Sequence, residues 1–184
     1  MSNFKTMIAS DPQPRHLVTS IKMSAADYSL WDFAGVDGLQ AAIALFTPAI
    51  SHIAPFQSFT TDFNHQPCSV LRLCENNFRV ALSAQLAFDQ SVAALNLKVW
   101  SKPCSASSLV IPTDLGLTHL AKIATTEPLY TLNPFPCDRA VPARINGIAI
   151  LAWHYLWVGQ LRLEIQTASH HVDAIRRAFL PLDI

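Results

Sequence analysis

The clearest hydrophobic pattern of the chain lies near its C-terminus. Between Arg144 and Arg162 there is no charged residue, and both alternating sets of positions are mostly apolar. Such a run is typical of a strand that is covered on both faces. It is shorter than the roughly 20 apolar residues that a membrane-spanning helix needs. We therefore predict one buried strand over residues 144–158 and no membrane span.

Gly159-Gln160 predicts a two-residue hairpin turn, because glycine readily adopts the positive φ of the first turn position. The partner strand then starts at Leu161 and alternates apolar and polar residues. With this turn, Trp157 lies beside Arg162, within reach of a cation–π contact, and Tyr155 lies beside Glu164. An aromatic row thus shares its face with a polar row, while His154 lies on the opposite, aliphatic face. We predict binding residues on this basis: Trp153, Tyr155, Trp157, Arg162 and His154.

Helical spacing marks the other elements. Val172, Ile175 and Phe179 predict a closing helix that packs on the sheet, begins after Thr167 or Ser169 and ends before Pro181. An amphipathic helix is expected over 39–53, with a kink at Pro48 or an end near 45–47. The remaining predictions are strands at 17–23, 56–63, 68–75, 78–88 and 109–111, helices at 24–33 and 113–127, and an irregular Pro-rich loop at 128–144. The segment 92–100 fits either a strand or a helix, with a strand favoured for its second half.

This order of elements indicates an α+β fold, with a mostly antiparallel sheet of about six to eight strands and three to four packed helices. Residues 1–15 resemble a flexible N-terminal tail, and residues 16–184 are long enough for a single domain. Loops as long as 128–144 are uncommon without a role. That loop is therefore the place for an internal boundary, if the chain has one.

The chain of 184 residues has 13 basic and 13 acidic residues, so only 14% of its residues are charged. A weakly charged surface is poorly protected against association, which favours a protein partner or a homo-oligomer. A chain without net charge lacks the long-range field that attracts nucleic acid. The N-terminal residues lack the apolar core of a signal peptide. We therefore expect a cytoplasmic protein with reduced cysteines.

Motifs of known chemistry are lacking in the sequence. Five glycines cannot form a phosphate-binding loop, and there is no zinc-protease, nucleophile-elbow or C-x-x-C motif. Cys68 and Cys74 lie about 20 Å apart if they share a strand, too far for one zinc ion. Cys104 and Cys137 have no evident basic neighbour that would lower a thiol pKa. We predict no metal site and no cofactor.

Two functions remain open. The first is a non-enzymatic cytoplasmic interaction or assembly protein, which uses an apolar and aromatic surface to bind a protein partner or itself. The alternative is a small-molecule-binding protein or enzyme with an apolar cavity, lined by the aromatic row and by Phe56, Phe59 and Phe63. In that case His154, Asp62 or Asp138 would supply polar contacts, although a capping or loop role is the simpler reading of Asp62.

Overall fold

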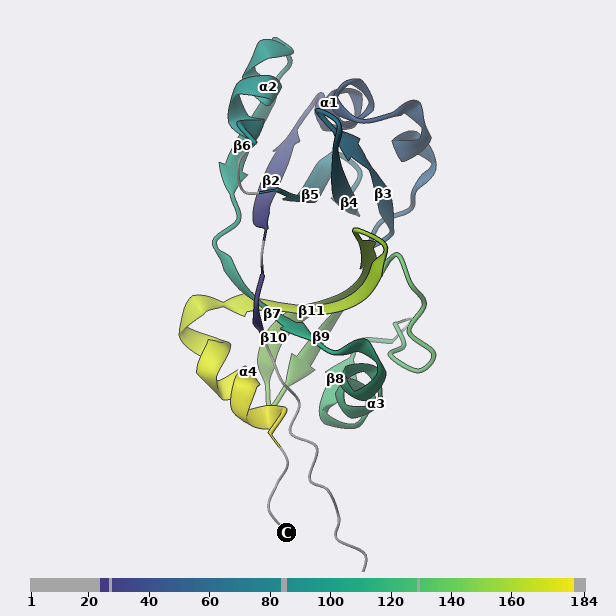
Figure 1. Ribbon diagram of the computed structural model, residues 1–184, viewed down its shortest axis with the longest axis vertical. Coiled ribbons are helices and arrows are strands. Elements are labelled where there is room, and N and C mark those ends of the chain that lie inside the picture. Colours follow the sequence, from purple (N-terminus) through teal and green to yellow (C-terminus); the bar gives the residue numbers. More distant parts are fainter. Residues whose placement is uncertain (1–23, 27, 84–85, 129, 181–184) are drawn as a thin grey trace, which may run out of the picture.

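The computed structural model describes residues 24–26, 28–83, 86–128 and 130–180. Its elements stack in four layers: two helices, a five-stranded sheet, a six-stranded sheet and two further helices (Figure 1). The helices are α1 (Gly38–Leu45) and α2 (Phe88–Ala94) over the five-stranded sheet, and α3 (Thr113–Ile123) and α4 (Val172–Ala178) over the six-stranded sheet. Two short 3-10 helices are η1 (Pro48–His52) and η2 (Ser169–His171).

The six-stranded sheet, here sheet A, and the five-stranded sheet, here sheet B, are antiparallel throughout the described residues. Sheet A has the order β1 (Ser24–Ala25), β7 (Ala106–Ile111), β11 (Gln160–Ala168), β10 (Ile148–Trp157), β9 (Arg139–Ile145), β8 (Ala124–Thr126). Sheet B has the order β3 (Ser58–Phe63), β4 (Gln66–Cys74), β5 (Asn77–Leu82), β2 (Ser29–Gly35), β6 (Val99–Pro103). The predicted α+β class is confirmed, with more strands than expected.

The two sheets are joined at two corners. At one corner β1 continues into β2 and β6 into β7, so one antiparallel ribbon passes from sheet B to sheet A. At the other corner residues 56–58 bond to both sheets: Phe56 N donates to Arg72 O at 2.6 Å, and Ala140 N donates to Phe56 O at 2.8 Å. The space between the sheets is therefore framed by backbone on two sides.

Three apolar cores separate the four layers. Sheet B packs on α1, α2 and η1 through aromatic residues such as Phe33, Phe78 and Phe88. Sheet A packs on α3 and α4 through aliphatic residues such as Leu163 and Ile175. The third core lies between the sheets, and its members are Tyr28, Leu71, Ala81, Ala140, Trp153, Tyr155 and Trp157.

The predicted single strand over 144–158 is wrong. Asn146 and Gly147 have φ values of 50° and 80° and form a tight turn between β9 and β10. Asn-Gly is the preferred sequence for such a type I′ turn. The charge-free run that begins at Ile145 passes through this turn, so the apolar pattern did not mark the end of β9. Residues 139–143, predicted as part of the Pro-rich loop, are therefore strand.

The second turn also differs from the prediction. Trp157 pairs with Gln160, so the turn residues are Val158 and Gly159, with φ values of 48° and 75°. Glycine occupies the second turn position instead of the first. The register shifts by two residues, and Tyr155 pairs with Arg162 instead of Glu164. A shift of two keeps every side chain on its predicted face.

Upstream predictions had mixed outcomes. The helix over 24–33 is wrong, because β1 and β2 occupy it; Trp31 and Phe33 face one core while Leu30 faces another, a strand alternation. The amphipathic helix ends at Leu45, as Pro48 predicted. Helix α2 begins at the end of the strand predicted over 78–88 and ends within the segment 92–100, which the sequence left open between strand and helix. The second half of that segment contains the start of β6, as predicted. The predicted tail over 1–15 and strand over 17–23 lie outside the described residues.

Candidate functional site

The predicted aromatic row is buried between the two sheets. Trp153 and Tyr155 are 0% exposed and Trp157 is 6% exposed. Trp153 stacks on Tyr155 with ring centroids 4.0 Å apart, and its Nε1 donates to Ser58 Oγ at 3.0 Å. Sheet B therefore covers these rings, so they do not form an exposed surface, and their predicted binding role stays a prediction.

A polar network centred on Glu164 lies beside these rings. The carboxyl of Glu164 is 0% exposed, and four donors reach it. At Oε2 they are the hydroxyls of Tyr28 and Tyr155, the second at 2.8 Å; at Oε1 they are Ser108 Oγ at 2.5 Å and Gln166 Nε2 at 2.8 Å. The Tyr155 hydroxyl also donates to the Tyr28 hydroxyl at 2.5 Å, so its single proton is shared between two acceptors. The carboxyl of Glu164 is thus enclosed by four polar side chains.

The network continues into sheet B through Arg79. This guanidinium donates to Gln166 Oε1 and holds Asp32 with two bonds, from Nε at 2.7 Å and from Nη2 at 2.9 Å. Such a bidentate pair is among the stronger polar contacts in proteins. Because Asp32 and Arg79 come from sheet B and Gln166 from sheet A, the network connects the two sheets.

The environment fixes the protonation of the two phenols. Burial and the nearby Glu164 carboxylate raise the pKa of Tyr28 and of Tyr155 well above the ordinary value for tyrosine. Both hydroxyls therefore stay protonated near neutral pH and act as hydrogen-bond donors. General base catalysis needs a group that can take up a proton, and neither phenol offers that.

The other predicted site residues are scattered. Arg162 joins the aromatic row: its guanidinium carbon lies 5.8 Å from the Trp157 ring centroid and 5.6 Å from that of Tyr28, which confirms the expected cation–π contact. His154 lies on the helix side of sheet A, where Nδ1 is 3.1 Å from Phe135 O and Nε2 has no partner in the described structure. Asp62 is exposed on β3, away from the network.

Sequence reasoning missed most of the network. The four residues Tyr28, Asp32, Arg79 and Ser108 come from three separate segments, which only strand pairing and the packing of the sheets bring together. One signal was present: Arg162, Glu164 and Gln166 alternate on the face that also holds the aromatic row. Three polar residues opposite large rings on a buried face indicate a polar network within a core.

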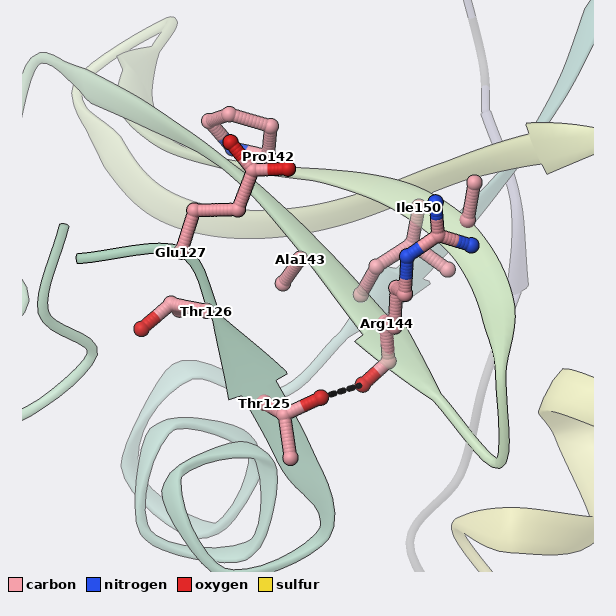
Figure 2. Close-up of a pocket in the computed structure, with 8 residues that line it drawn as sticks. Thr125, Thr126, Glu127, Pro142, Ala143, Arg144 and Ile150 are labelled. Carbon is pink, nitrogen blue, oxygen red and sulfur yellow. Dashed lines mark hydrogen bonds between the residues drawn. The ribbon is translucent and has the colours of Figure 1, made fainter.

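Two cavities adjoin the space between the sheets. One, of about 370 Å³, opens at the ribbon corner and is lined by Tyr28, Cys104, Ser108 and Arg176 among others. The hydroxyls of Tyr28 and Ser108 already donate to Glu164. The second, of about 210 Å³, lies at the β8 edge of sheet A (Figure 2).

Metal and membrane features are lacking in the described part of the chain. No three His, Cys, Asp or Glu residues among the described ones lie close enough to hold a metal ion. No helix formed by the described residues has the length and apolar character required to span a bilayer. All four cysteines, at positions 68, 74, 104 and 137, are free.

Comparison with known proteins identifies the fold. No family model and no curated protein sequence matches the chain. Among solved structures, it is similar to the glycine cleavage system aminomethyltransferase T from Bartonella henselae, with a TM-score of 0.67 and 13% identity over 84% of this chain. The chain spans only 44% of that protein.

A second solved structure matches the chain over most of both lengths. It is a chain of the heterotetrameric sarcosine oxidase from Corynebacterium sp. U-96, in complex with pyrrole 2-carboxylate, with a TM-score of 0.62 and 15% identity. The match covers 86% of this chain and 81% of that chain. At these identities the likeness establishes a shared fold.

Proposed function

We propose that this chain is a non-catalytic, protein-binding subunit of a multi-subunit enzyme in the cytoplasm. The observation that carries the proposal is the enclosure of Glu164: this buried carboxyl beside the aromatic rings is held by the side chains of Tyr28, Ser108, Tyr155 and Gln166. A catalytic carboxyl has to exchange a proton or a bond with a substrate. The network instead joins the two sheets and holds a binding scaffold rigid.

The binding surface proposed here lies at the tip of the β10–β11 hairpin. Val158 is 62% exposed, Leu161 is 52% exposed and Leu115, in the first turn of α3, is 47% exposed. Thr113 Oγ1 donates to Leu161 O at 3.0 Å, which holds the start of α3 against the hairpin. We call Leu115, Leu156, Val158 and Leu161 the hairpin patch. We propose the hairpin patch, instead of the buried aromatic row, as the exposed apolar surface that the weakly charged composition led us to expect.

The likeness to a chain of a heterotetrameric enzyme supports a heterologous partner over self-association, because the two chains match over most of their lengths. Exposed apolar residues that cluster on an otherwise polar surface mark protein-binding sites. The four free cysteines fit a reducing, cytoplasmic compartment. The alternative, a cavity lined by the aromatic row, has less support because those rings pack against one another and against sheet B.

The experiment compares Leu161→Glu with Leu180→Glu in the source cell. Both leucines are exposed to a similar extent, 52% and 45%, but Leu180 follows α4 and lies outside the hairpin patch. Each tagged full-length variant is purified, and the native mass and enzyme activity of the co-purified assembly are measured. We expect L161E to lose the assembly and L180E to keep it.

Three outcomes would contradict the proposal. If wild-type protein runs as a monomer without co-purified enzyme, no multi-subunit assembly exists. If both glutamate variants retain the assembly, the hairpin patch is not the contact. A mass equal to a multiple of this chain alone would show a homo-oligomer instead.

A further inference from the structure

The cavity at the β8 edge is built from neighbouring positions of three strands. Arg144 pairs with Thr125 on one side and with Ala149 on the other, and Pro142 pairs with Leu151. These residues continue the face of sheet A that carries Trp153 and Tyr155, at the end that lies away from the buried rings. The cavity holds about 210 Å³, and Pro142 and Ala149 form its apolar floor on this face. The side chains of Ala143 and Ile150 belong to the core on the helix side of sheet A.

Opposite charges flank this floor. In the view of Figure 2, the Glu127 carboxylate and the Arg144 guanidinium lie on either side of Ala143. Within the described structure no ion pair of 4.0 Å or less joins them. Arg144 is held by a bond from Nη1 to Gly147 O at 3.1 Å, while Thr125 Oγ1 donates to its backbone oxygen at 3.5 Å. Both side chains line the cavity, and they are not paired with each other.

We propose that this cavity binds a small zwitterion, an α-amino acid with an aliphatic side chain. Its carboxylate pairs with the guanidinium of Arg144, which suits planar carboxylate recognition. Its ammonium group pairs with the carboxylate of Glu127, and its side chain covers the apolar floor. The volume lies below the range of roughly 300–1,000 Å³ of sites for drug-sized ligands, so a single amino acid fits better than a nucleotide.

This site is independent of the hairpin patch, since the two share no residue. Loss of the partner assembly therefore leaves the proposal standing. Failure of amino-acid binding likewise leaves the proposed subunit role standing.

The test is isothermal titration of the full-length protein with three probes. L-Leucine carries both charges, L-leucinamide lacks the carboxylate, and N-acetyl-L-leucine lacks the ammonium group. We expect L-leucine to bind and each analogue to bind at least about tenfold more weakly. No detectable binding of L-leucine at about 10 mM overturns the proposal. Equal binding of the three probes overturns it as well, because the charges would then contribute nothing.

Charge-neutral variants locate the site. Arg144→Gln and Glu127→Gln should each weaken L-leucine binding about tenfold or more. Arg177→Gln and Glu75→Gln change the same residue types at exposed positions outside the cavity and should bind as wild type does. Melting curves check that all four variants fold. Unchanged binding in folded R144Q and E127Q would show that leucine binds elsewhere and would overturn the assignment.

Discussion

At the scale of single residues, Glu164 is the centre of the polar network between the two sheets. A buried carboxylate is costly unless hydrogen bonds replace the lost water, and here donors from β7, β10 and β11 and from Tyr28 replace it. The carboxylate in turn gives the two buried phenol hydroxyls a hydrogen-bond acceptor, because a buried hydroxyl without a partner would also be costly. The network thus stabilises one arrangement of the two sheets.

The raised phenol pKa values predict a loss of stability in alkali. The folded pKa of Tyr28 and Tyr155 lies above the unfolded value of about 10. Their contribution is therefore fully present below about pH 10 and is lost as the pH rises toward the folded values. Each phenol should lower the free energy of unfolding by about 1.4 kcal/mol per pH unit in that window. Urea unfolding between about pH 8 and pH 11 measures this decrease in the free energy of unfolding.

Tyr155→Phe supplies the control for this prediction. The variant should be less stable at about pH 8, by about 1 kcal/mol for the lost hydrogen bond, and its alkaline slope should be shallower by one phenol. Cys68 adds a slope of the same sign from about pH 9, because burial and then the Asp62 carboxylate raise the pKa of its thiol to about 12. An unchanged slope in Y155F would contradict the assignment to the phenol.

At the scale of elements, the two hairpins of sheet A use the same turn with different residues. Asn146-Gly147 has the residues that a type I′ turn prefers, whereas Val158-Gly159 places a β-branched residue at a φ of 48°. The left-handed region is unfavourable for such residues. Val158 gains little from packing in return, because it is 62% exposed. This cost fits a side chain that is retained for contact with a partner.

Val158→Asn should therefore stabilise the isolated chain and weaken partner binding. Relief of the turn should raise the free energy of unfolding by about 1 kcal/mol, measured by urea unfolding. Val36→Asn is the matched control, since Val36 is exposed but lies outside the residues with positive φ; its stability should change by less than about 0.5 kcal/mol. Lower stability in V158N than in V36N would contradict the strain argument.

The turns also show how much of the fold the sequence could predict. Alternation assigned the aromatic and aliphatic faces of β10 correctly, because face depends only on odd or even position. It could not separate β9 from β10, since the charge-free run continues through Asn146-Gly147, although that dipeptide is itself a hairpin signal. The Glu164 network was beyond reach, because its members meet only through the pairing of β7 with β11 and the packing of sheet on sheet.

At the scale of the whole molecule, the open question from the sequence is whether residues 16–184 form one domain. The sheets share an apolar core and the Arg79–Gln166 contact. Each sheet also has its own helices and its own core. Two units with separate cores unfold together only if the interface between them is strong compared with the stability of each unit. Trp153 is the residue that tests this, because it is fully buried at the interface and bonds to Ser58 of sheet B.

We expect wild-type protein to unfold in one cooperative transition and Trp153→Ala to unfold in two. Removing this indole should cost about 3–5 kcal/mol, mostly at the interface between the sheets. Urea unfolding is followed by fluorescence in two backgrounds on a protein without Trp100, one retaining Trp31 of sheet B and one retaining Trp157 of sheet A. The reference proteins in both backgrounds carry Trp153→Phe, so that an aromatic ring remains at the interface while the indole fluorescence is removed. Coincident midpoints for the W153F references and separated midpoints for the W153A proteins would establish one domain held by the inter-sheet core. Separated midpoints in the W153F references as well as in the W153A proteins would show two domains, because the interface then does not couple the unfolding of the two sheets.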